Sequence, residues 1–91
     1  MSTIFAKIIR GELPSKKIFE NERILAIEDI HPIAPVHILI MPKKEISNLQ
    51  SVSPHDLPLI GEIVEVAQKL AEKLQIADGY RLLTNNGSKG G

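Results

Sequence analysis

The chain has 91 residues, of which 43% are hydrophobic but only three are aromatic, and its eleven basic residues balance eleven acidic ones. This length fits one globular domain with an aliphatic core, and the evenly spread, balanced charge argues against nucleic-acid binding. Cysteine is absent, which excludes disulfides and thiolate metal sites and is compatible with a cytoplasmic location.

The apolar runs are too short or too interrupted to enter a membrane. Lys7 breaks the run at 4–9, and no small-residue cleavage pattern of a signal peptide follows it. The run at 32–42 contains His37 and is far shorter than a bilayer span. We therefore expect a soluble protein with no membrane partner.

The N-terminal part of the chain predicts a short helix followed by a β-hairpin. Apolar residues at 4, 5, 8 and 9 share one helical face, and Gly11 can end this helix. The segments 17–20 and 23–27 then flank a turn-like interval at 21–22, a pattern typical of an antiparallel hairpin.

A proline-bounded loop and an aliphatic strand are expected next. Prolines at 32 and 35 exclude a helix or a central strand over 30–35, because each lacks a backbone donor and restricts its predecessor. The nearly unbroken aliphatic character of 36–41 predicts a strand that is buried on both faces and closed by Pro42.

The clearest helical pattern runs from 57 to 74, with a start near Ser53-Pro54 or Asp56. Its apolar positions cover about 160° of a helical wheel, which is wider than packing on one sheet requires. The extra width predicts a second contact, for which a twofold partner is the natural candidate. Residues 80–84 are then expected to form a strand with alternating core and surface positions.

The glycine-rich segment from Asn85 to Gly91 has the composition of a loop whose amides could approach an anion. The residue order of a Walker A loop is absent, and no helix follows to add its dipole. Taken alone, this composition favours a flexible tail over a phosphate-binding loop.

The three histidines do not have the spacing of a metal site, because no two lie one helical turn apart on a predicted helix. His55 is expected at the surface. His37 interrupts an aliphatic strand, so its ring requires hydrogen-bond partners, either in a structural role or next to an active site. Spacing alone favours the structural role.

Asp29 follows the second predicted strand and precedes the proline-bounded loop. A carboxylate in this position could accept two hydrogen bonds from ribose hydroxyls. It could equally bond to the backbone of its own loop, and the local sequence by itself favours that second role.

Taken together, these segments resemble the histidine-triad (HIT) nucleotide-binding family, specifically its phosphoramidase branch. Three stretches carry the resemblance, at 3–14, at 26–37 running into 42–44, and at 80–91. They span essentially the whole chain in the order and spacing of the family. The resemblance implies an α+β fold, an antiparallel sheet with one short and one long helix, and a homodimer built by the 57–74 helix and the 80–84 strand.

The resemblance also implies roles for individual residues. An apolar slot for a purine would be lined by Phe5, Ile8, Ile27 and Ile30. Asp29 would hold the ribose hydroxyls, Asn85 would lie near the phosphate, and His37 would hydrogen-bond into the catalytic network without belonging to the triad. The family implies no metal and no cofactor.

The His-x-His-x-His strand that follows the paired glycines in the family is not found in these 91 residues. The glycine pair here is Gly90-Gly91, so the triad would lie beyond Gly91, and no catalytic residue is expected within 1–91. We therefore expect 1–91 to be a single HIT-like domain that is incomplete at its C-terminus. In complete members a triad histidine attacks the α-phosphorus of a nucleoside phosphoramidate and the amine leaves with assistance from a nearby hydroxyl, after which water resolves the covalent nucleotidyl-histidine.

Two functional interpretations follow from the resemblance. The complete protein would be a phosphoramidase or nucleotidyl hydrolase that acts on a purine nucleoside monophosphate or phosphoramidate, with the 91-residue chain inactive alone. The alternative is a non-catalytic nucleotide-binding or dimeric scaffolding module. The same residues serve both interpretations.

Overall fold

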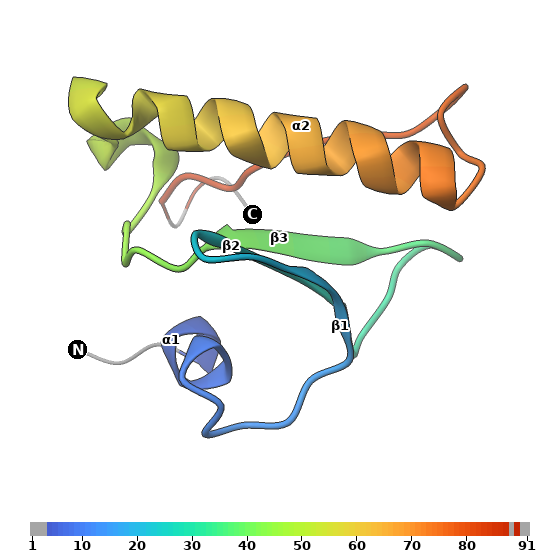
Figure 1. The fold of residues 1–91 in the computed structure, drawn as a ribbon, viewed down its shortest axis with the longest axis horizontal. Helices are drawn as coiled ribbons and strands as arrows, with labels where there is room; N and C mark the ends of the chain where they lie inside the picture. The colour runs from blue at the N-terminus through green and yellow to red at the C-terminus, as the bar shows by residue number, and fades with distance from the viewer. Residues whose placement is uncertain (1–3, 88, 90–91) are drawn as a thin grey trace. The chain divides into compact units, whose positions relative to one another are not determined.

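The computed structural model describes residues 4–87 and residue 89. The chain divides into two compact units, one ending at Glu45 and the other beginning at Ile46, each with its own secondary structure. The first unit contains one helix and three strands, namely α1 (Ile4–Ile9), β1 (Lys17–Glu20), β2 (Ile24–Glu28) and β3 (Ile38–Pro42). The strands form one antiparallel sheet in the order β1-β2-β3 (Figure 1).

Asn21 makes the turn that joins β1 to β2. Its side-chain oxygen accepts hydrogen bonds from the backbone N–H groups of Arg23 (2.8 Å) and Ile24 (2.7 Å), while its own N–H donates to the Ile24 carbonyl (2.9 Å). Asparagine favours such turns because its short side chain can replace a backbone acceptor. The predicted hairpin is confirmed, with its second strand one residue later than expected.

The pairing of β1 with β2 contains a β-bulge. Lys17 lies opposite Ile27 and Phe19 lies opposite Ala26, so β1 accommodates one extra residue between these two pairs. The pairing of β2 with β3 has no such shift and runs in continuous register over five residues of each strand.

The central strand of the sheet is β2, and its four apolar residues are all buried. The prediction of burial on both faces for the following strand was wrong, since β3 is only half-buried except at Met41. An aliphatic run shows that a strand is apolar, but it does not show whether the strand lies at the centre or at the edge of the sheet. In the described residues β3 is an edge strand, which explains its greater exposure.

A small aliphatic core fixes α1 against one face of the sheet (Figure 1). Its buried members are Ile8, Leu25, Ile27 and Met41, with Ile9, Leu13 and Leu39 packed against them. The helix ends in a Schellman motif, in which the N–H of Glu12 donates to the Lys7 carbonyl and that of Gly11 to the Ile8 carbonyl. Gly11 has a φ of 79°, the left-handed conformation for which glycine is favoured.

The second unit is helical. Over 46–87 it contains two 3-10 turns and one long helix, namely η1 (Leu49–Ser51), η2 (Pro54–Asp56) and α2 (Leu57–Lys73). The long helix is as predicted, and with the antiparallel sheet it confirms the α+β fold class. Its buried stripe is formed by Leu59, Val66, Ala67, Leu70 and Ala71. None of the helices in the described residues is both long and apolar enough to cross a membrane.

Residues 80–84 do not form the predicted strand, and their backbone is irregular. A strand requires a neighbouring strand to complete its backbone hydrogen bonds. The described residues of the second unit contain no other strand, so the alternating side chains of 80–84 have no ladder within that unit. Tyr80, Leu82 and Leu83 are all exposed.

The predicted glycine-rich segment is described only in part. Ser88, Gly90 and Gly91 lie outside the described residues, as would the triad strand expected beyond Gly91. The predictions that Asn85 lies near a phosphate and that a triad follows Gly90-Gly91 therefore stay predictions. What the structure does describe of this segment is 85–87 and residue 89.

Candidate functional site

Asp29 lies directly after β2, where the chain enters the loop that returns as β3. Its backbone N–H donates to the His37 carbonyl (3.0 Å), which closes the base of the loop. Its carboxylate Oδ1 accepts from the backbone N–H of His31 (2.8 Å). The side chain is 19% exposed. The carboxylate is thus held in one orientation while part of it still reaches solvent.

His37 stands beside this carboxylate at the other end of the loop. Its Nε2 lies 3.4 Å from Oδ2 of Asp29, and its Nδ1 accepts from the backbone N–H of Ile33 (3.3 Å). Both ring nitrogens are therefore engaged, as expected for a histidine whose ring requires hydrogen-bond partners. The predicted strand at 36–41 begins only at Ile38, so His37 lies in the loop just before β3 and not within the strand. His31 and His55 are exposed, and the described residues contain no cluster of three metal-ligating side chains.

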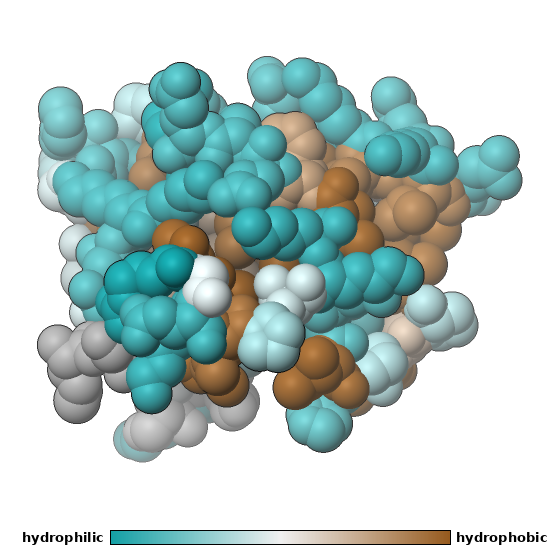
Figure 2. All heavy atoms as spheres, turned by 60° about the horizontal axis from the view of Figure 1, so that its bottom comes forward, coloured by the Kyte–Doolittle hydropathy of each residue, from teal (hydrophilic) through white to brown (hydrophobic). Residues whose placement is uncertain are grey.

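The loop between Asp29 and His37 exposes apolar side chains. Ile30 is 75% exposed, Ile33 is 91% exposed and Val36 is also exposed. On α1, Phe5 is 44% exposed. Figure 2, which turns the α1 side of the first unit forward, shows hydrophobic residues reaching the surface between hydrophilic ones. These exposed apolar side chains are available to contact a ligand or a partner.

The four residues predicted to line a purine slot differ in how much of each is accessible. Phe5 and Ile30 are exposed, whereas Ile8 and Ile27 belong to the aliphatic core and are only 9% and 3% exposed. Their role in a slot stays a prediction. The core burial of Ile8 and Ile27 leaves Phe5 and Ile30 as the two whose surfaces are free to contact a ring.

Asn85 lies in the second unit and is exposed. Its neighbour Asn86 has a role that the sequence did not reveal, because its side-chain oxygen accepts from the backbone N–H of Gln50 (2.7 Å). This bond ties 85–87 to η1 across 36 positions of sequence. Gly87 follows with a φ of 75°, a conformation that favours glycine.

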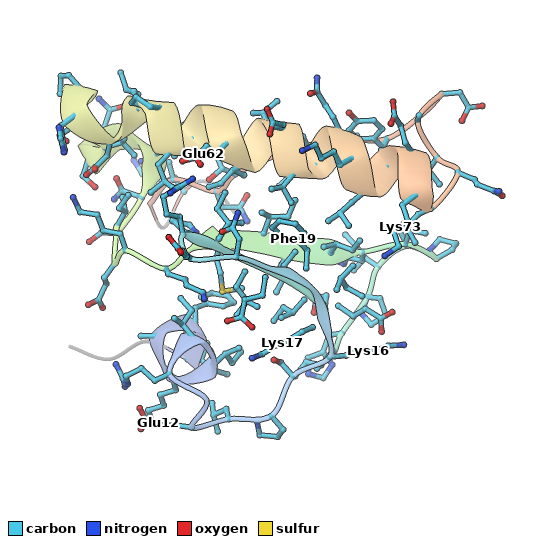
Figure 3. The ribbon with its side chains drawn as sticks, in the orientation of Figure 1. Glu12, Lys16, Lys17, Phe19, Glu62 and Lys73 are labelled. Atoms are coloured by element: carbon cyan, nitrogen blue, oxygen red, sulfur yellow. The ribbon has the colours of Figure 1, made fainter. Side chains whose placement is uncertain are left out.

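A charge cluster at the hairpin end of the sheet was also missed from sequence. Glu20 accepts from Nζ of Lys43 (2.7 Å) and of Lys17 (3.0 Å), and so links β1 to the residue after β3. Lys17 is seen at the start of β1 in Figure 3. The Lys43 hydrogen bond, followed by that from Lys17, holds the pKa of Glu20 below its usual value. Lys43 lies far from Glu20 in sequence, so no local pattern signals the cluster.

This lowered pKa predicts a small, acid-sensitive contribution to stability. Because the folded-state pKa is below the unfolded one, the contribution is present above the usual glutamate pKa and is lost as pH falls through the folded value. We expect the urea midpoint of the wild type to exceed that of Glu20→Gln near neutral pH, and the difference to shrink on acidification. Added salt should reduce it as well. A difference that grows at low pH would contradict this assignment.

The sequence matches the model of one protein family, described as the HIT domain, over residues 10–91. The chain belongs to the HIT family. A HIT-like protein of Chlamydia pneumoniae is 46% identical over 89 residues, covering 98% of this chain and 81% of that protein.

HIT structures also match the fold. A HIT family hydrolase from Legionella pneumophila is 43% identical with a TM-score of 0.95, covering 99% of this chain and 81% of that one. A histidine triad nucleotide-binding protein from Candida albicans is 36% identical with a TM-score of 0.86, covering 98% of this chain and 65% of that one. The resemblance carried by the three sequence stretches is therefore confirmed as HIT family membership.

Proposed function

We propose that this HIT domain binds a purine nucleotide, with the ribose hydroxyls on the carboxylate of Asp29. The observation that carries the proposal is the fixed carboxylate at the end of β2, beside a loop of exposed apolar side chains. The Legionella pneumophila relative is a hydrolase, and the Candida albicans relative is a nucleotide-binding protein. The Candida albicans relative supports a nucleotide as the ligand class, and the Legionella pneumophila relative supports a hydrolytic reaction.

The hydrogen bonds of Asp29 leave it able to receive a diol. Each carboxylate oxygen can accept about two hydrogen bonds. Oδ1 receives one from His31, and Oδ2 faces Nε2 of His37, so each oxygen keeps one further acceptor position. Two adjacent hydroxyls, as in ribose, match two carboxylate oxygens, and bonds to an ionised acceptor are among the stronger ones.

The residues proposed for the base lie in the first unit, as Asp29 does. We assign the purine to the exposed faces of Phe5 and Ile30, with Ile8 and Ile27 supporting them from the aliphatic core. Aliphatic and aromatic surfaces read the shape of a ring more than its edge. Asn85 is our candidate for the phosphate, on the family resemblance and on its exposed position.

Hydrolysis would need groups beyond those named so far. The 91 residues hold histidines only at 31, 37 and 55, and these do not form the alternating triad. His37 has both ring nitrogens engaged with Asp29 and Ile33, so we do not assign it as the nucleophile. We propose a phosphoramidase or nucleotidyl hydrolase activity for a cytoplasmic protein that carries the triad beyond Gly91, and none for this chain alone.

The direct test is a titration of the ¹⁵N-labelled chain with adenosine and AMP, followed by amide chemical shifts. We expect weak binding, with a Kd on the order of 1 mM, and shifts centred on Phe5, Asp29 and Ile30. Adenosine 5′-phosphoramidate should not be turned over by the 91-residue chain. Shifts confined to other residues would overturn the proposed site, and measurable turnover would overturn the assignment of catalysis to the triad.

A dimeric scaffolding function is the second candidate, because the second unit exposes apolar side chains. Leu57 and Val64 are exposed two helical turns apart on α2, and Tyr80, Leu82 and Leu83 are exposed in the same unit. We infer a homodimer through the 57–74 helix and 80–84. Such side chains gain stability when a partner covers them.

Sedimentation velocity tests this inference. We expect a mass twice the 10.1 kDa of the chain. Leu57→Glu should shift the equilibrium to monomer, because it places a charge on the proposed contact. Glu65→Gln is the matched control, because Glu65 lies on the solvent-exposed face of the helix, where it pairs with Lys69. This substitution should leave the dimer intact. A monomeric wild type at high concentration would remove the scaffolding function while leaving nucleotide binding untouched.

A further inference from the structure

The loop from Asp29 to His37 is closed by hydrogen bonds that converge on the His37 residue. The Asp29 N–H donates to the His37 carbonyl (3.0 Å), and the Ile33 N–H donates to Nδ1 of the ring (3.3 Å). Nε2 faces Oδ2 of Asp29 at 3.4 Å. The ring thus bridges the middle of the loop and the carboxylate at its start.

These contacts require one protonation state of the ring. A backbone N–H can donate to Nδ1 only if that nitrogen carries a free lone pair. In neutral imidazole the proton must then lie on Nε2, where it can be donated to the Asp29 carboxylate. A protonated ring carries N–H groups at both positions, so the Ile33 N–H would face another donor.

We propose that His37 is a positioning residue, whose neutral, Nε2-protonated ring latches Ile33 and thereby holds the loop and Asp29 ready for a ligand. Protonation releases the Ile33 amide. It also turns the contact at Nε2 into an ion pair, which competes with a ligand for Oδ2 of Asp29. The effect on a ligand rests on the proposed nucleotide function, whereas the latch itself does not.

The charged groups around the ring are consistent with this division of roles. Asp29, at the end of β2, faces Nε2, while the partner of Nδ1 is the uncharged Ile33 amide. Glu28 precedes Asp29 and pairs with Lys16 (3.4 Å), and His31 contributes its backbone N–H to the Asp29 carboxylate. Protonation of the ring therefore strengthens the contact between Nε2 and Asp29 and breaks the hydrogen bond to Nδ1. The group that is released is the Ile33 amide.

Two substitutions separate the functions of the two ring nitrogens. His37→Asn can place an amide oxygen near the position of Nδ1, so it keeps an acceptor for Ile33 without a titrating group. His37→Gln extends its amide toward the position of Nε2, so it keeps a group near Asp29 but loses the acceptor for Ile33. His31→Asn is the control, because His31 meets the Asp29 carboxylate through its backbone N–H.

The readouts are the ring tautomer, from long-range ¹H–¹⁵N spectra, and the hydrogen-exchange protection of the Ile33 amide as His37 titrates. We expect the Nε2–H tautomer, and a loss of about tenfold in Ile33 protection on ring protonation, the size of one hydrogen bond. His37→Asn should remain protected without a pH step, and His37→Gln should be unprotected at every pH. His31→Asn should retain the step. An Nδ1–H tautomer, or protection indifferent to ring protonation, would overturn the latch.

Adenosine titration of the same samples separates the latch from the proposed function. We expect the wild-type affinity to fall as His37 is protonated, and this fall to be absent in His37→Asn. If Ile33 shows the step but adenosine does not bind at any pH, the nucleotide proposal fails and the latch stands. If adenosine binds with no pH dependence that tracks His37, the positioning role fails and the nucleotide proposal stands.

Discussion

Asp29→Asn is expected to weaken adenosine binding by about tenfold to a hundredfold, the loss of charge-assisted hydrogen bonds worth roughly 1.5–3 kcal/mol. Asparagine keeps the shape of the side chain and one oxygen for the His31 amide, but it replaces the other acceptor with a donor. Titration of amide chemical shifts measures the change. Glu28→Gln is the matched control, because this neighbouring carboxylate is exposed and pairs with Lys16.

A change of ligand sharpens the same test. 2′-Deoxyadenosine lacks one of the two hydroxyls that Asp29 is proposed to receive, so it should bind the wild type more weakly than adenosine does. In Asp29→Asn the two ligands should bind with similar affinity, because the shared interaction is already lost. If Asp29→Asn discriminates between the ligands as strongly as the wild type, the ribose lies elsewhere.

Leu25→Ala is expected to lower the free energy of unfolding by about 3 kcal/mol or more, the usual loss for leucine in a filled core. Leu25 lies in the central strand, has no exposed surface and belongs to the cluster that holds α1 to the sheet. Urea unfolding followed by circular dichroism at low temperature measures the change. In a chain this short, such a loss is a large part of the total stability.

Ile33→Ala is the control for this core substitution. It removes a similar aliphatic side chain, but one that is 91% exposed in the loop after β2. We expect a change within about 0.5 kcal/mol, as for most surface substitutions. Equal losses from the two variants would mean that the aliphatic cluster is not the main source of stability in the first unit.

The elements that could be predicted from sequence are those whose signals are local. The hairpin follows from two apolar segments around Asn21, whose side chain makes the turn by itself. The long helix follows from its own period, with Pro54 at the start of the preceding 3-10 turn. Neither element depends on a distant segment for its assignment.

The incorrect predictions concern properties that depend on neighbours. An aliphatic composition could not distinguish β2, the central strand, from β3 at the edge. The alternation at 80–84 is compatible with a strand, yet a strand forms only where another chain segment offers its hydrogen bonds. The Glu20 cluster likewise depends on a distant segment, because Lys17 and Glu20 belong to β1 whereas Lys43 follows β3.

The sequence could predict which residues belong to the candidate site, but it could not predict how their side chains contact one another. Asp29 and His37 could be singled out, one for its place after a strand and the other for interrupting an aliphatic run. The tautomer of His37 could not be predicted from sequence, because it depends on which backbone amide reaches Nδ1. The same limit applies to Asn86, which contacts Gln50 although its sequence context resembles a flexible end.

The bulge in β1 makes the two edge strands of the sheet differ in how readily another strand can pair with them. A bulge bends and twists an edge strand and so discourages further pairing, whereas a regular edge strand with unpaired amides and carbonyls favours it. In the described residues β3 borders no strand on its outer side, and it keeps continuous register with β2. Growth of the sheet, whether by later polypeptide or by aberrant association between partly unfolded molecules, should therefore begin at β3 and not at β1.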